Sequence, residues 1–230
     1  MTTKPTILFV HGFWGGAAHW SKVILALSHK GYDKLRAVEL PLTSLADDAA
    51  RARKMAVQQQ GPVLLVGHSY GGAVITEMGD LPNVSGLIYI AAFAPDAGES
   101  PGGISQAKPP SAIANLAPDS DGYLWIKPDK FHESFCQDLT PDEALVMAVT
   151  QKAPVAGTFG DKITVPAWKK KPCWYQVSSE DRMIHPENQT HMAGRMNPRK
   201  IITLGASHAS LASHPDAIVA LIEDAVRSLA

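Results

Sequence analysis

Short apolar runs recur along the chain, and most of the stretches between them have the apolar spacing of a helix. Six runs rich in β-branched or aromatic residues predict strands, at residues 6–10, 35–40, 63–66, 86–93, 173–177 and 200–204. The clearest of them are apolar throughout, as expected of parallel strands covered on both faces. The alternation of strands and helices predicts an α/β fold with a doubly wound, mostly parallel sheet.

Two of the helices have recognisable starts. Ser44 is expected to cap a helix that extends to about residue 59, with Asp47 and Asp48 in its first turn, where the helix dipole favours negative charge. The last helix is expected to open at residues 213–216, with Pro215 near its start and a continuous apolar face beyond it.

The pattern changes in the middle of the chain. Residues 98–172 are rich in proline and glycine, contain scattered aromatic side chains and lack a long apolar run. We interpret residues 96–171 as an inserted cap, with one helix near residues 141–151, and residues 1–95 and 172–230 as the α/β core.

Composition excludes several classes of partner. The 230 residues include 21 Lys and Arg against 22 Asp and Glu, so no net field favours nucleic acid or an anionic membrane. No run is long enough to span a bilayer, the amino-terminal apolar run is too short for a signal peptide, and a cytoplasmic location is expected. Cys136 and Cys173 are interpreted as idle thiols, and neither a metal nor a cofactor is predicted; the oligomeric state is left open.

Residues 67–71, Gly-His-Ser-Tyr-Gly, follow the buried strand at residues 63–66 and precede a helix-like stretch. This G-x-S-x-G pattern between a strand and a helix is typical of a nucleophile elbow, in which the apical residue adopts a strained conformation. Gly67 and Gly71 leave room for that strain. Ser69 is therefore the candidate nucleophile.

A serine nucleophile needs a base, and His208 is the best-placed histidine because it lies on the loop after the last strand. His214 is the rival, although it is also expected in the first turn of the last helix. His11 and His68 adjoin the same loops, where packing or local hydrogen bonding is the more common role. No metal is required for this chemistry.

The histidine in turn needs a carboxylate. Asp181 follows the strand at residues 173–177, and the chain order Ser69, Asp181, His208 is the one expected of this architecture. Glu180 and Asp96 are the alternatives. For an oxyanion, the main-chain N–H groups of Phe13 and Tyr70 are the candidate donors.

Several segments together carry a family resemblance. The chain resembles the α/β-hydrolase superfamily, and within it the compact plant-type esterase and hydroxynitrile lyase group with its bacterial homologues. The matching pieces are His11-Gly12 with Trp20, and residues 67–72, 91–96, 180–184 and 205–208. The resemblance implies triad positions for Ser69, Asp181 and His208, oxyanion positions for Phe13 and Tyr70, and a variable cap that reveals little about the substrate.

At three positions the chain differs from other members of the superfamily, and these differences narrow the range of reactions expected. The lyases of this group carry Thr where the chain has Gly12, and Lys where it has Ala209, while dehalogenases and epoxide hydrolases carry Asp where it has Ser69. The leading hypothesis is a serine hydrolase that cleaves a small or medium carboxylic ester through an acyl-enzyme. The alternatives are a cofactor-free C–C or C–CN lyase on the same triad, and a ligand receptor with slow turnover.

Overall fold

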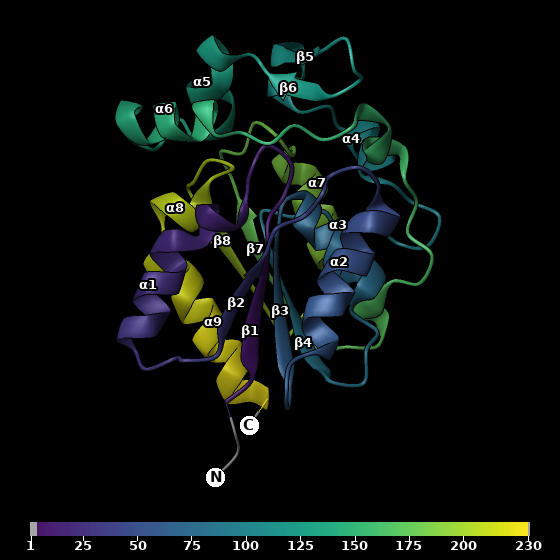
Figure 1. Cartoon of the computed structure of the whole chain (residues 1–230), viewed down its shortest axis with the longest axis vertical. Helices are drawn as coiled ribbons and strands as arrows, with labels where there is room; N and C mark the ends of the chain where they lie inside the picture. Colours follow the sequence, from purple (N-terminus) through teal and green to yellow (C-terminus); the bar gives the residue numbers. More distant parts are fainter. Residues whose placement is uncertain (1–3, 230) are drawn as a thin grey trace.

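The computed structural model describes residues 4–229, and its centre is a six-stranded parallel sheet (Figure 1). The strand order is β2-β1-β3-β4-β7-β8, and each neighbouring pair runs parallel. This confirms the predicted α/β fold. The chain winds in one direction from β1 to β2 and in the other from β3 onward, so its switch point lies between β1 and β3, where such sheets bind ligands. The strands are β1 (Thr6–Val10), β2 (Leu35–Val38), β3 (Val63–His68), β4 (Val84–Ile90), β7 (Cys173–Ser178) and β8 (Lys200–Leu204).

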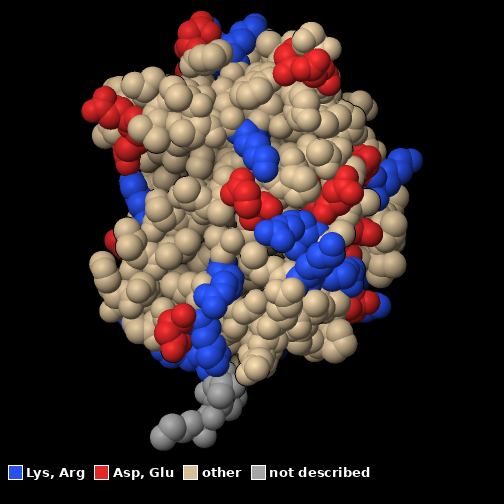
Figure 2. Space-filling model, viewed as in Figure 1, with Lys and Arg blue, Asp and Glu red and all other residues tan. Residues whose placement is uncertain are grey.

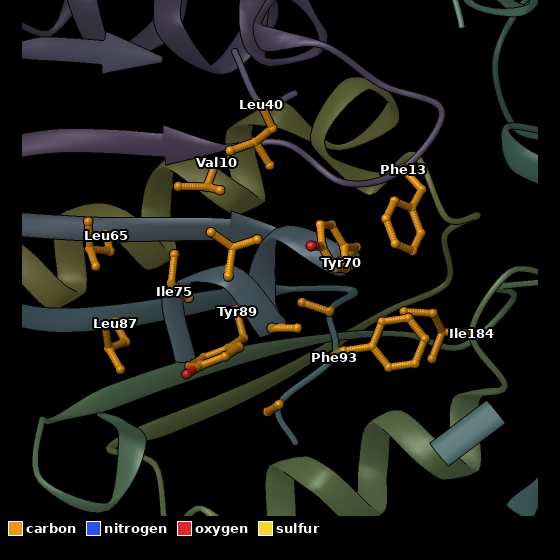
Figure 3. Packing of buried hydrophobic residues seen from close by; sticks show 14 of the residues in the cluster. Val10, Phe13, Leu40, Leu65, Tyr70, Ile75, Leu87, Tyr89, Phe93 and Ile184 are labelled. Carbon is orange, nitrogen blue, oxygen red and sulfur yellow. The ribbon is translucent and has the colours of Figure 1, made fainter. Parts of the chain in front are cut away.

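Both faces of the sheet are covered by helices. Along β1 the side chains alternate: Ile7 and Phe9 join one buried cluster, whereas Leu8 and Val10 join the other. The second of these clusters is shown in part in Figure 3. This two-sided burial explains why the strands are apolar throughout. One face carries α1 (Ser21–His29) and α9 (Pro215–Leu229), and the other carries α2 (Leu45–Val57), α3 (Tyr70–Met78) and α7 (Pro186–Arg195) (Figure 1).

Most predicted boundaries agree with the structure to within a few residues, and the exceptions have local causes. The strand predicted at residues 86–93 is β4, which ends at Ile90 because Ala91 has a φ of 42° and cannot continue a strand. The Ser44 side chain accepts a hydrogen bond from the N–H of Asp47, as predicted for the cap of α2. Helix α7 was not predicted. Two short helical turns complete the core, η1 (Ala17–Trp20) and α8 (Ser210–Ser213).

The segment between β4 and β7 consists of short elements and adds no strand to the six-stranded sheet. Helices α5 and α6 and the small β5–β6 ribbon lie beyond the carboxyl ends of the sheet strands (Figure 1). Thr140 and Glu143 form a reciprocal capping box at the start of α6. The division into a core and a separate cap stays a prediction. The elements are α4 (Pro101–Ala107), η2 (Ser111–Asn115), β5 (Leu116–Pro118), β6 (Leu124–Ile126), η3 (Pro128–Lys130), α5 (Phe131–Phe135), α6 (Pro141–Val149), η4 (Ala156–Gly160) and η5 (Ala167–Lys169).

Charged side chains of both signs lie on the face of the molecule drawn in Figure 2, and acidic and basic ones lie next to one another. Of the helices described, none combines the length and the apolar character needed to cross a membrane. Cys136 and Cys173 are both buried. The cytoplasmic location stays a prediction.

Candidate active site

Ser69 occupies a strained turn between β3 and α3. Its φ of 56° and ψ of −126° lie in a region that non-glycine residues rarely adopt. The flanking glycines are required by close packing: a Cβ on Gly67 would lie 2.6 Å from the carbonyl oxygen of Gly71, and a Cβ on Gly71 would lie 2.3 Å from that of Val10. The elbow therefore has the geometry that the G-x-S-x-G pattern predicts.

Asp181 and His208 are joined by a buried hydrogen bond. Nδ1 of His208 lies 2.7 Å from Oδ2 of Asp181, and both side chains are fully buried. Oδ1 of Asp181 accepts hydrogen bonds from the N–H groups of Met183 at 2.7 Å and Ile184 at 2.9 Å. Oδ2 also accepts a hydrogen bond from Nε2 of Gln189 at 2.7 Å. The other groups bonded to Asp181 are all donors, so its oxygens act as acceptors. In the neutral ring that donates from Nδ1 to Asp181, Nε2 of His208 is an acceptor.

Nε2 of His208 is buried and has no hydrogen-bond partner within residues 4–229. A buried polar atom without a hydrogen-bond partner lowers the stability of the fold, and such atoms in native proteins are typical of functional sites. His68, next to Ser69 in the chain, donates from Nε2 to the main-chain carbonyl of His208 at 2.8 Å, and the two rings lie 4.7 Å apart. The loop carrying His208 is thus held against the elbow, although Ser69 and His208 share no hydrogen bond in this state.

The other candidate bases have partners of their own. His11 donates from Nδ1 to the carbonyl of Gly12 at 2.8 Å, and its Nε2 accepts the N–H of Leu40 at 3.0 Å. Burial lowers the pKa of His11, although the hydrogen bond to Gly12 opposes that effect. His214 bonds the hydroxyl of Ser213 through Nδ1 at 2.9 Å. Both histidines are engaged locally, as expected for His11.

The alternative acids, Asp96 and Glu180, are not bonded to His208. Asp96 forms an ion pair with Lys169 at 2.5 Å. Glu180 lies beside Asp181 in the chain, and its main-chain carbonyl accepts Nε2 of Gln137 at 2.7 Å. Neither carboxylate bonds a histidine within the described part of the chain. Asp181 is the acidic residue that the structure brings to His208.

Phe13 and Tyr70 lie together at the top of the sheet. Their rings stack at a centroid distance of 3.9 Å and an interplanar angle of 14°, and they face one another in Figure 3. Tyr70 is the first residue of α3, where a main-chain N–H has no acceptor within the helix. The two residues are therefore neighbours at the end of the sheet that carries the elbow, and the role of their N–H groups as oxyanion donors stays a prediction.

Asp48 lies in the first turn of α2, as predicted, and its side chain is fully buried. It accepts hydrogen bonds from the phenol of Tyr70 at 2.7 Å and from the N–H of Leu42 at 2.8 Å. Burial raises its pKa from 3.8 to about 6, and these two hydrogen bonds limit the rise. The available signal was its position on the same helix face as Leu45 and Ala52, both of which are buried.

A cavity of about 480 Å³ opens over Ser69. Of the side chains described, those that line it are uncharged and mostly apolar, and they come from both the core and the segment between β4 and β7. The polar side chains in its wall are Ser69, Ser105 and Gln106. The apolar ones are Phe13, Trp14, Phe93, Pro109, Pro110, Ile113, Leu116, Leu124, Phe159, Met183 and Ile184.

Comparison with known proteins shows the family of the chain. The family model described as "Alpha/beta hydrolase family" matches residues 7–221, nearly the whole chain. The chain belongs to the alpha/beta hydrolase family.

Relatives within this family span almost the full chain. It is 28% identical to the alpha/beta hydrolase nvfD of Aspergillus novofumigatus, with 96% of each protein covered, and 24% identical to methylesterase 8 of Arabidopsis thaliana, with 92% of this chain and 86% of that protein covered. The structure of a pyrethroid hydrolase from Sphingobium faniae JZ-2 matches with a TM-score of 0.83 at 21% identity, covering 98% of each chain, and so supports the fold. The predicted resemblance to plant-type esterases is confirmed at the level of the family.

Proposed function

We propose that this alpha/beta hydrolase cleaves carboxylic esters through an acyl-enzyme formed on Ser69. The observation that carries the proposal is the Asp181–His208 hydrogen bond of 2.7 Å. Nε2 of His208 is buried and has no partner among residues 4–229, and the loop that carries it is bonded to His68, next to the strained Ser69. A serine hydroxyl is a weak nucleophile by itself, and this arrangement supplies the base that would activate it.

In the proposed mechanism, Oγ of Ser69 attacks the ester carbonyl while Nε2 of His208 accepts the hydroxyl proton. Asp181 stabilises the resulting imidazolium, which then protonates the departing alcohol. Water, activated by the same histidine, attacks the acyl-enzyme and releases the acid, returning Ser69 to its starting state.

The main-chain N–H groups of Phe13 and Tyr70 are proposed to bind the oxyanion of the tetrahedral intermediate. Stacking of the two rings at 3.9 Å fixes the relative position of the loop after β1 and the start of α3. Donors held in place before the reaction stabilise the developing charge without reorganisation. Loss of one such donor costs on the order of 100-fold or more in kcat.

The cavity favours a small or medium substrate whose acyl or alcohol part is apolar and uncharged, because its walls are mostly apolar and uncharged. The names of two relatives, methylesterase 8 and the pyrethroid hydrolase, are consistent with hydrolysis. The segment over the cavity, proposed to be a cap, would exclude water around the bound ester.

The site also favours hydrolysis over cyanohydrin cleavage. A Cβ on Gly12 would lie 2.5 Å from Cβ of Ser69, so the threonine of the lyases does not fit on this backbone. A departing cyanide needs a cation, yet Lys127 bonds the carbonyl of Ala114 and Lys130 pairs with Glu133, and neither lysine lines the cavity.

The decisive experiment is labelling with a neutral aryl phosphonate, followed by peptide mapping and an assay with aryl esters of increasing acyl length. We expect one phosphonate label per chain, on Ser69. Aryl esters should be turned over rapidly, which would distinguish an enzyme from a receptor with slow turnover. No cyanide should be released from mandelonitrile above background. The Ser69→Ala variant should neither react with the phosphonate nor turn over ester. A label on another residue would contradict the mechanism.

A further inference from the structure

The loop that carries Asp181 is held on both sides of that residue by groups from the segment between β4 and β7. Before it, the main-chain carbonyl of Glu180 accepts Nε2 of Gln137 at 2.7 Å. After it, Nη1 of Arg182 donates to the main-chain carbonyl of Glu133 at 2.7 Å. Neither contact touches the carboxylate of Asp181 itself, so both act on the position of the loop.

The loop that carries His208 is held by the same segment. The N–H of Ser207, one residue before His208, donates to Oδ2 of Asp138 at 2.9 Å. Burial tends to raise the pKa of Asp138, but hydrogen bonds from Ser207 and Ser213 outweigh it and hold the pKa below its usual value. Asp138 is therefore an ionised acceptor at neutral pH.

The part of this segment around Phe135 has hydrogen bonds of its own and packs against the imidazole of His208. The ring of Phe135 is fully buried and meets the ring of His208 edge-on, at a centroid distance of 4.9 Å and an angle of 81°. Just beyond, the N–H of Leu139 donates to the carbonyl of Cys136 at 3.0 Å, and the ring of His132 donates to the carbonyl of Leu139 at 3.0 Å. These bonds close the turn between α5 and α6.

We infer that residues 135–138, here called the clamp segment, set the spacing between the Asp181 loop and the His208 loop. Gln137 and Asp138 are positioning residues, because they bond the residues adjacent to the acid and the base and not the reacting atoms. The inference rests on the proposed function. Its consequence is that the segment over the cavity governs the chemical step as well as substrate binding.

The test compares Asp138→Ala with Asp138→Asn and with a matched control, Glu143→Gln. Glu143 is an acid on α6 whose contact with the core is an ion pair to Lys22 at 2.5 Å, far in sequence from both loops. Asparagine keeps an oxygen that accepts the N–H of Ser207, whereas alanine removes it. The measurements are kcat and KM for an aryl ester, the rate of phosphonate labelling and the melting temperature.

We expect Asp138→Ala to lower kcat and the labelling rate on the order of 10-fold with little change in KM, since small misplacements of catalytic groups slow chemistry strongly. In Asp138→Asn both rates should lie within about threefold of those of the unmodified protein, because the hydrogen bond from the N–H of Ser207 is kept. If Asp138→Ala does not fold, Gln137→Met provides the same test on the other loop.

Two results would overturn the inference. The first is a kcat that is unchanged in both Asp138→Ala and Gln137→Met, as it should be in the control Glu143→Gln. The second is an Asp138→Asn variant whose kcat is as low as that of Asp138→Ala. The final stoichiometry of labelling distinguishes this failure from failure of the proposed function. If all variants label Ser69 fully and at one rate, only the positioning role is wrong. If the unmodified protein does not label at Ser69, the proposed function itself is wrong.

Discussion

The phenol of Tyr70 donates a 2.7 Å hydrogen bond to Oδ2 of Asp48, a carboxylate that is fully buried between α2 and α3. This contact links Tyr70, the residue after the candidate nucleophile, to a residue of α2 that lies 22 positions earlier in the chain. Burial raises the pKa of Asp48 from 3.8 to about 6, so its charge state changes within a range accessible to experiment.

Asp48 should make stability depend on pH. Because its pKa is higher in the folded state, its stabilising contribution is full below about pH 3.8 and is lost as the pH rises through about 6. Relative to Asp48→Asn, the unmodified protein should lose up to about 3 kcal/mol between these limits. Urea unfolding of both proteins from pH 4 to 7 measures this difference.

Asp47→Asn is the matched control for Asp48. Asp47 is exposed, and hydrogen bonds from Thr43 and Ser44 lower its pKa, so its contribution has the opposite sign and is lost only on acidification below its ordinary value. A difference curve for Asp48→Asn that is flat from pH 4 to 7 would contradict the raised pKa.

Acidification should destabilise the fold through its partly and fully buried histidines. Burial, and then the neighbouring His11, lowers the pKa of His19 from 6.5 to about 4, and burial holds that of His68 well below 6.5. A lowered folded pKa gives stability that is full above about 6.5 and is lost as the pH falls toward 4. Relative to His19→Gln, the unmodified protein should therefore lose stability in urea unfolding as the pH falls over this range, whatever the opposing contribution of Asp48. An equally steep loss of stability in that variant would show that other groups cause it.

The acid of the proposed triad is tested by Asp181→Asn. Asparagine cannot stabilise the imidazolium, and we expect kcat to fall by about 1,000- to 10,000-fold with the fold intact. Asp96→Asn and Glu180→Gln are the controls and should change kcat little, since neither side chain bonds His208. The acid would have to be reassigned if either control proved more damaging than Asp181→Asn.

Gly12 should not tolerate a side chain. A Cβ there would lie 2.5 Å from Cβ and 2.9 Å from Oγ of Ser69, so Gly12→Ala must displace the elbow or the loop after β1. We expect a large loss of ester hydrolysis and a lower melting temperature. Gly194→Ala is the control because a Cβ at this exposed position of α7 meets nothing within 4 Å, and it should raise helix stability by about 1 kcal/mol. Normal kinetics in Gly12→Ala would show that the backbone there adapts.

The sequence by itself determined the features that depend on local pattern. The strand predicted at residues 63–66, the elbow at Ser69 and the capped start of α2 are each specified by neighbouring residues, through a continuous apolar run, close glycine packing and capping. The order of Ser69, Asp181 and His208 after three strands of one parallel sheet also follows from the chain, because the carboxyl ends of parallel strands share an edge.

Only the tertiary structure decided the contacts between distant segments. Gln189 on the unpredicted helix α7 bonds Asp181, Asp48 lies buried behind Tyr70, and Asp138 holds the loop of His208. As judged from their neighbours in the chain, Gln189 and Asp138 could equally lie in solvent, and only for Asp48 does a shared helix face with Leu45 and Ala52 indicate burial. Their positions are fixed by how helices and loops pack on the sheet, since a buried polar group is stable only where packing brings it a partner.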